Sequence, residues 1–176
     1  MKRYLPYYLL TLCMFSFSDC KKDKRSQPDN PYGLPNATHN GSMIFAWRVN
    51  GQNQIVASDL YSQKKGKITK DSTTVFSSFG NAYYFGVLTF VVYGNAMIQK
   101  PYDLSNPVQT KFIYGTDSTC MGISSTVTAI NEALGTLTFT KLDSLNKIIS
   151  GNFSFKIPVP GCDTLNFTDG RFDVGY

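Results

Sequence analysis

From Ser42 to the C-terminus, apolar residues recur in short runs that are separated by turn residues. Segments such as 43–49 (MIFAWRV), 82–93 (AYYFGVLTFVVY) and 147–157 (KIISGNFSFKI) are rich in Val, Ile, Phe, Tyr and Thr, which favour strands. The runs show no sustained helical stripe. The pattern therefore predicts an all-β fold, either an antiparallel β-sandwich or a small barrel of about nine to eleven strands.

Two turn signals place hairpins along this pattern. Asn50-Gly51 lies between two strand-like runs and is a strong hairpin signal, and Gly80-Asn81 is a second candidate. The run 82–93 is apolar on both faces, which predicts a central strand, and Gly86 within it would allow a bend. In the segment 170–176 (GRFDVGY), alternation predicts that Phe172 and Val174 point inward, with Arg171 and Asp173 forming an ion pair outside.

The N-terminus has the layout of a secretion signal. Two basic residues are followed by the apolar run 4–17 (YLPYYLLTLCMFSF), and charge returns abruptly at Lys21. The arrangement resembles a bacterial lipoprotein signal, so we expect residues 1–19 to be cleaved and Cys20 to carry the lipid. Asp19 and Phe17 depart from the small residue and the Leu that are usual before such a cysteine. The alternative is a simple cleaved signal that leaves Cys20 as a free thiol.

The residues after the signal divide into a tether and one domain. Residues 20–41 would be the lipidated cysteine and a flexible tether, because 21–42 is polar, contains three prolines and has no apolar periodicity. Residues 42–176 would be a single all-β domain.

The basic residues are concentrated near the N-terminus. The chain has a net charge of +5, but six basic residues lie within the first 25, and the rest is nearly neutral. A nucleic-acid-binding face is therefore not expected. The later basic run 64–70 (KKGKITK) is interpreted as a solvated hairpin loop, with a polyanion site as the alternative.

The C-terminal third carries a family resemblance. The segments GTLTFTKLDSLNKIISGNFSFKI and FTDGRFDVGY are similar to those of small uncharacterised lipoproteins of Bacteroidetes-type bacteria, a domain of unknown function. The matching positions are Gly135, Leu137, Phe139, Thr140, Asp143, Ser150, Gly151, Phe153, Phe155, Thr168, Asp169, Gly170, Arg171, Phe172 and Asp173. The resemblance implies an all-β fold and a location in the cell envelope, and it implies no activity.

Residue chemistry gives little support to catalysis. His39 is the single histidine and Glu132 the single glutamate, so neither a zinc site nor a Ser-His-Asp arrangement is expected. We predict no catalytic residue, no metal and no cofactor. Two aspartates could still meet as a glycosidase pair. The motif DGRFD (169–173) could hold calcium or a substrate, but we interpret it as a tight Asp-Gly turn followed by a strand.

Two further sets of residues are candidates for function. Four aromatic residues could form a stacking platform for sugar rings, with core packing as the alternative: Trp47, Tyr83, Tyr84 and Tyr93. Once Cys13 leaves with the signal and Cys20 takes the lipid, Cys120 and Cys162 remain. Export would place this pair where disulfides persist, so we expect them to be bonded, with two separate buried thiols as the alternative.

Together these features predict a non-enzymatic, lipid-anchored module of the outer membrane, facing either the periplasm or the exterior. Its role would be binding or surface architecture, and its partners the membrane and a glycan or a protein. The alternative is a carbohydrate- or peptide-binding accessory of an uptake system. A membrane-spanning barrel is disfavoured, because segments such as 123–130 are too short and polar to form an outward apolar band.

Overall fold

The computed structural model describes residues 32–57, 62–81, 84–116, 133–158 and 163–176. Within these ranges the secondary structure consists of ten strands and no helix. A helix that could cross a membrane is accordingly not found there. The strands are β1 (Ile44–Val49), β2 (Gln52–Ile55), β3 (Gln63–Ile68), β4 (Ser72–Asn81), β5 (Tyr84–Tyr93), β6 (Pro101–Asp103), β7 (Thr110–Thr116), β8 (Leu134–Asp143), β9 (Ile148–Ile157) and β10 (Leu165–Gly175).

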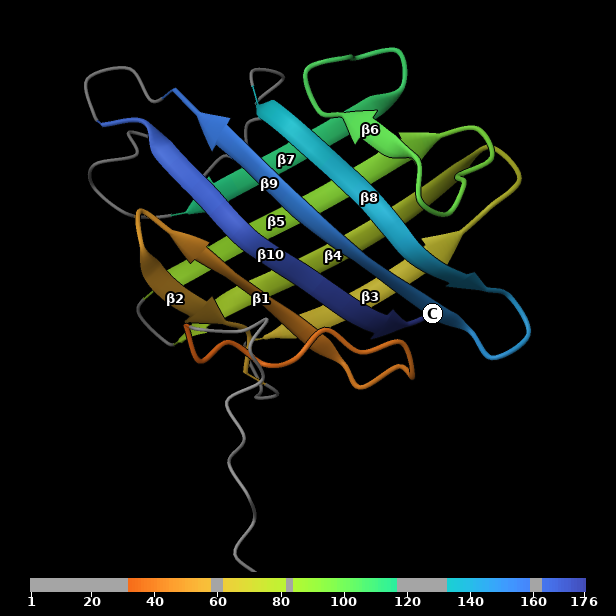
Figure 1. The fold of residues 1–176 in the computed structure, drawn as a ribbon, viewed down its shortest axis with the longest axis horizontal. Coiled ribbons are helices and arrows are strands. Elements are labelled where there is room, and N and C mark those ends of the chain that lie inside the picture. The colour runs from red at the N-terminus through yellow and green to blue at the C-terminus, as the bar shows by residue number, and fades with distance from the viewer. Residues whose placement is uncertain (1–31, 58–61, 82–83, 117–132, 159–162) are drawn as a thin grey trace, which may run out of the picture. The chain divides into compact units, whose positions relative to one another are not determined.

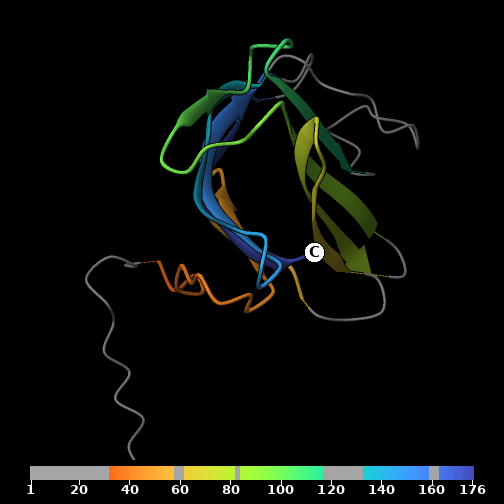
Figure 2. The same cartoon turned by 90° about the vertical axis from the view of Figure 1, so that its right-hand side faces the viewer.

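The strands form two antiparallel sheets. One has six strands in the order β2-β1-β10-β9-β8-β6, and the other has four in the order β3-β4-β5-β7. Figure 1 shows the six-stranded sheet in front of the four-stranded one, with the two strand directions crossing, and Figure 2 shows the sheets as two layers. The all-β prediction is confirmed in its sandwich form.

The core between the sheets is built mainly from aromatic rings. Phe153 of β9 lies near its centre, 3% exposed, and its ring centroid is 4.9 Å from that of Phe90 in the opposite sheet. The ring of Phe155 of β9 packs in the same way against that of Phe112 of β7, with the ring centroids 4.7 Å apart. Because strand residues alternate between faces, every second residue of β9 reaches this core.

Three phenylalanine rings lie over glycines on the neighbouring strand. Each ring and its glycine are direct cross-strand partners: Phe79 with Gly86, Phe172 with Gly151, and Phe153 with Gly170. A Cβ atom at these glycines would lie between 2.3 and 2.5 Å from a ring carbon, which is inside contact distance. The glycines therefore provide the space that the rings fill. Gly86 therefore has a packing role beneath the ring of Phe79.

A β-bulge in β10 sets which of its residues face the core. In β10 the register with β9 shifts between Phe167 and Gly170, and Asp169 has a positive φ of 54°. The extra residue lets both Phe167 and Phe172 point inward although they are an odd number of positions apart. The predicted Asp-Gly turn at this point is wrong, because Asp169-Gly170 lies inside one continuous strand. The inward orientation of Phe172 and Val174 is confirmed.

The predicted hairpins are largely confirmed. Asn50 and Gly51 connect β1 to β2 with positive φ values of 47° and 83°, as a type I′ turn requires. The second hairpin joins β4 to β5, but Gly80 and Asn81 belong to β4, where they pair with Phe85 and Tyr84. The segment 64–70, expected to be a solvated loop, mostly forms the edge strand β3. Its lysines suit an edge, because charge there discourages pairing with other chains.

The domain begins earlier than the sequence indicated. Residues Tyr32–Tyr176 form one compact unit. Leu34, expected in the tether, is buried with 3% of its surface exposed. Residues 32–42, called here the N-terminal strap, contact β1, β2, β8 and β10. Placing the tether boundary at residue 41 was therefore wrong for residues 32–41.

The fit of rings over glycines can be tested by a double-mutant cycle. Gly170→Ala should lower the free energy of unfolding by about 1–3 kcal/mol, because the new Cβ overlaps the ring of Phe153. In a Phe153→Leu background the same substitution should cost less than half as much. Urea denaturation of the four chains measures the coupling.

The matched cycle at Gly151 should give a different result. A Cβ at Gly151 meets the ring of Phe172 and also the carbonyl oxygen of Thr138, each at 2.5 Å. Because the backbone oxygen stays when the ring is shortened, Gly151→Ala should keep most of its cost in a Phe172→Leu background. Equal costs for Gly170→Ala with and without Phe153 would contradict the ring-over-glycine account.

Candidate functional site

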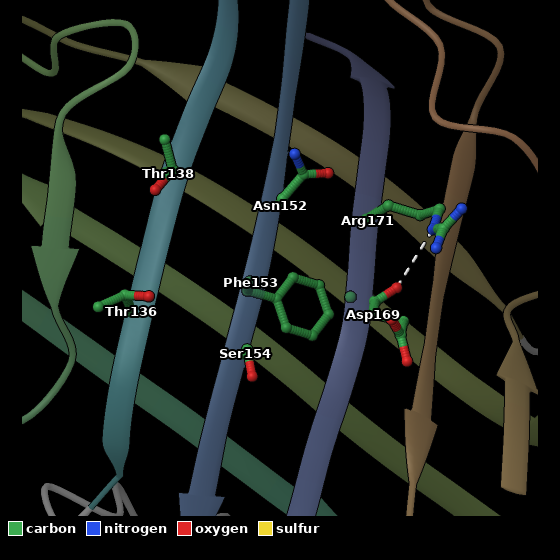
Figure 3. Close-up of a pocket in the computed structure, with 8 residues that line it drawn as sticks. Thr136, Thr138, Asn152, Phe153, Ser154, Asp169 and Arg171 are labelled. Atoms are coloured by element: carbon green, nitrogen blue, oxygen red, sulfur yellow. Dashed lines mark hydrogen bonds between the residues drawn. The ribbon is translucent and has the colours of Figure 1, made fainter. Parts of the chain in front are cut away.

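A shallow polar groove lies on the outer face of the six-stranded sheet (Figure 3). It has a volume of about 320 Å³, within the usual range for small-ligand sites. Its lining comes from three adjacent strands: Thr136 and Thr138 of β8, Asn152, Phe153 and Ser154 of β9, and Asp169, Gly170 and Arg171 of β10.

The groove follows from strand alternation and from the bulge in β10. Asn152 and Ser154 point outward because the residues between and beside them, among them Phe153, fill the core. Counted from the inward-facing Phe167, regular alternation would turn Asp169 toward the core, and the bulge instead turns it outward, onto the same face as Arg171. Hydroxyl, amide, carboxylate and guanidinium groups thus share one surface.

The charged end of the groove is held in place by hydrogen bonds. The Arg171 guanidinium donates from Nη1 to the carbonyl oxygen of Pro35, at 3.1 Å, and from Nε to that of Asp169, at 3.2 Å. The side chain of Asp169 also pairs with Arg48 of β1, with 3.9 Å between Arg48 Nη1 and Asp169 Oδ2. Arg171 is therefore shared between the groove and the strap.

The strap is fastened to the sheet by one buried carboxylate. Asp173 of β10 is 1% exposed. Its oxygens accept hydrogen bonds from three successive backbone amides and two hydroxyls: those of Asn40 (3.1 Å), Gly41 (3.0 Å) and Ser42 (3.0 Å), and those of Thr38 (2.6 Å) and Ser150 (2.7 Å). Consecutive amides that converge in this way form an anion-binding nest.

The predicted outward ion pair between Arg171 and Asp173 is wrong. Both side chains leave the same face of β10, but the strap covers Asp173, while Arg171 bonds to backbone carbonyls. Burial by itself raises the pKa of Asp173. The hydrogen bonds from Thr38, Ser42, Ser150 and Gly41 outweigh burial, so that the pKa of Asp173 is lower than that of an ordinary aspartate.

Further contacts hold the two ends of the strap. The guanidinium of Arg48 lies 3.8 Å from the ring centroid of Tyr32, and the Asn53 side-chain amide donates to the carbonyl oxygen of Tyr32 at 2.6 Å. At the other end, Lys141 Nζ donates to the carbonyl oxygen of His39 at 2.9 Å. His39 therefore contributes its backbone to the strap, and its exposed ring lies 3.3 Å from the Thr140 hydroxyl.

The described residues do not bring the predicted aromatic platform together. Trp47 is 1% exposed, and its ring packs against Phe79 in the core, so that no face is open to a ligand. We therefore remove Trp47 from the platform. Tyr93 is 45% exposed on the outside of the four-stranded sheet. Tyr83 and the side chain of Tyr84 lie outside the described part of the structure.

The three candidate cysteines also lie outside the described residues. The lipid attachment at Cys20 therefore stays a prediction, and so does the disulfide between Cys120 and Cys162. Among the residues that are described, histidine, cysteine, aspartate and glutamate do not gather into a group of three that could hold a metal ion. The groove lining itself contains neither histidine nor cysteine nor glutamate.

Sequence reasoning missed most of the groove. Thr136, Thr138, Asn152 and Ser154 are not among the sequence-predicted site residues, and they occupy outward positions of β8 and β9. The sequence does show polar residues at the outward positions of these two strands. It does not show that β8, β9 and β10 lie side by side, which requires the strand order.

Comparisons with protein-family models, with curated proteins and with solved structures gave no significant match.

Removing the charge of Asp173 should loosen the strap. Asp173→Asn should lower the free energy of unfolding by about 2–4 kcal/mol at pH 7, because an amide cannot accept all five hydrogen bonds. The folded-state pKa is lower than the unfolded value of ~3.9, so this stability is present above that value and disappears as the pH falls through the folded pKa.

Denaturation at pH 7 and at pH 3 distinguishes this contribution from a general acid effect. The parent chain should lose more stability on acidification than Asp173→Asn does. Asp169→Asn, a change of an exposed carboxylate on the same strand, is the matched control and should follow the parent. An identical acid response of Asp173→Asn and the parent would contradict the assignment.

Proposed function

We propose that this protein is a non-enzymatic, lipid-anchored binding module of the bacterial cell envelope. The groove on the six-stranded sheet is its ligand site. The ligand is a small polar molecule that is rich in hydrogen-bonding groups, and a carbohydrate suits the site best. The observation that carries the proposal is the lining itself, which combines two threonine hydroxyls and an asparagine amide with the Asp169–Arg171 end.

The chemistry of the lining supports a glycan. Sugar hydroxyls both donate and accept hydrogen bonds, and so do threonine, serine and asparagine side chains, while aspartate accepts and arginine donates. Ser154 already donates its hydroxyl hydrogen to the carbonyl oxygen of Phe167 at 3.2 Å, which leaves the oxygen as an acceptor. The strap fixes Arg171 before any ligand arrives, so that ordering this side chain costs little on binding.

The same lining argues against a hydrolytic enzyme. Its single carboxylate, Asp169, has no second carboxylate beside it in the groove, whereas glycosidases use two. A panel of hydrolase substrates should accordingly give no turnover.

The anchor and the disulfide belong to the same proposal. The apolar run 4–17 and the charge that follows Cys20 support export and lipidation. A lipidated Cys20 with two or three acyl chains would hold the domain at the membrane, since each buried methylene contributes about 0.8 kcal/mol. Outside the cytoplasm, Cys120 and Cys162 would form a disulfide.

Ligand binding through the groove has a direct test. Glycans found by array screening should raise the melting temperature of the chain. Asn152→Ala and Thr138→Val should each weaken binding about three- to tenfold, the effect of losing one neutral hydrogen bond of ~0.5–1.5 kcal/mol. Thr74→Val, on an outward position of the other sheet, is the control and should bind normally. Ligands whose affinity is unaffected by both groove substitutions would show that the groove is not the site.

Anchoring is tested independently of ligand binding. The protein expressed in a Gram-negative host should enter the detergent phase on phase partitioning, and Cys20→Ser should move it to the aqueous phase. Cys13→Ser is the matched control and should still partition into detergent, because Cys13 leaves with the signal. An intact mass without an added lipid at Cys20 would refute the anchor.

A further inference from the structure

We infer that the outer face of the four-stranded sheet is a second membrane-contact surface that binds anionic lipid headgroups. This surface, called here the cationic face, consists of the outward side chains of β3, β4, β5 and β7. It is on the opposite side of the sandwich from the groove, and the inference depends neither on the ligand of the groove nor on the anchor at Cys20.

Strand register places the members of the cationic face in two adjacent rows. Val75, Phe90 and Phe112 point into the core, so the residues beside them on each strand point outward. The two rows, read from β3 across to β7, are Lys65–Phe76–Thr89–Ile113 and Lys67–Thr74–Val91–Lys111. Lysines thus stand at both edges, and between them each row has one apolar side chain, Phe76 or Val91, and one threonine.

Exposure agrees with this placement except at Thr89, which is buried with 8% of its surface exposed. Lys65, Lys67 and Lys111 are all exposed, while Phe76 and Val91 between them are half-buried. Tyr93, the last residue of β5, is 45% exposed at the end of the face. A tyrosine in this position suits the boundary between headgroups and water, where its ring is apolar and its hydroxyl stays wet.

The charge on this face has one sign. Among the described residues, the outward positions of β3, β4, β5 and β7 carry three lysines and no carboxylate. In the β3–β4 turn, Asp71 is adjacent in sequence to Lys70. The outer face of the six-stranded sheet differs, because there Asp169 lies between Arg48 and Arg171, and Lys141 pairs with Asp143 at 3.3 Å.

An anionic lipid surface fits this combination better than a dissolved polyanion. Lysines at both edges are attracted to the charged headgroups, and the apolar strip between them gains by contact with the lipid interface. A dissolved polyanion would use the lysines and leave the apolar strip in water. The contact should weaken as salt rises, because exposed charges are screened within about 10 Å at 0.1 M.

The test uses the chain from residue 21 onward, which contains every described residue and lacks both the leader and the lipid. This chain should co-sediment with vesicles in which one third of the lipid is phosphatidylglycerol, and it should not co-sediment with vesicles of phosphatidylcholine alone. Lys65→Gln/Lys67→Gln/Lys111→Gln should weaken binding roughly tenfold to hundredfold, since each lysine near an anionic surface contributes a factor of about five.

A charge-matched control variant separates the face from net charge. Lys100→Gln/Lys147→Gln/Lys156→Gln removes the same charge from exposed positions outside the cationic face and should bind like the parent. Equal weakening in both triple variants would overturn the inference, because binding would then follow net charge alone. Absence of binding to anionic vesicles at 50 mM salt would overturn it as well. A melting temperature close to that of the parent would establish that each variant is folded.

A fluorescence measurement locates the contact. The native Trp47 is buried in the core, so its emission should not change with vesicles. Tyr93→Trp adds a reporter on the cationic face and should shift to the blue when anionic vesicles are added. Asn152→Trp, on the groove side, should not shift. A shift of the reporter at position 152 and not of that at 93 would show that the membrane contacts the other sheet.

Discussion

The buried carboxylate of Asp173 joins parts of the domain that are far apart in the sequence. It lies on the last strand, accepts a hydrogen bond from Ser150 on β9, and receives the amides of Asn40, Gly41 and Ser42 from the strap. A buried charge is tolerated only when its hydrogen-bonding capacity is filled, so the strap and the carboxylate each require the other. The strap in turn supplies the carbonyl of Pro35 that holds Arg171 at the groove.

The same outer surface depends on how the core is packed. The bulge that turns Asp169 outward is also what brings Phe167 and Phe172 into the core, and Gly170 beside it leaves room for the ring of Phe153. Packing inside the sandwich and the shape of the groove are therefore two consequences of one irregularity in β10. The two outer faces differ in chemistry. The face of the six-stranded sheet has charges of both signs and the polar groove, and the proposed ligand binds there. The face of the four-stranded sheet is cationic with an apolar strip, and the proposed membrane contact is there.

The fold could be predicted from local patterns, because alternation and Asn-Gly turns act over a few residues. The sequence alone could not reveal features that depend on distant pairing. In the sequence, Asp173 has the pattern of a solvent-facing residue, because the strap that covers it is distant along the chain. Asp169-Gly170 has the pattern of a turn, because a bulge favours the same residues with positive φ values as a turn does. Trp47 stayed open between a platform and core packing, because the sequence does not distinguish an aromatic residue on an inner face from one on an outer face. The groove required the order β10-β9-β8, which only the sheet topology supplies.

The central claim is that the strap belongs to the folded domain through Asp173, and amide hydrogen exchange followed by NMR tests it most directly. The amides of Asn40, Gly41 and Ser42 should exchange at least about 100-fold more slowly than in an unstructured chain at neutral pH, because the Asp173 carboxylate binds all three. In Asp173→Asn these three amides should lose most of that protection, while the amides of β9 keep theirs. Unprotected exchange of the three amides in the parent chain would contradict the account.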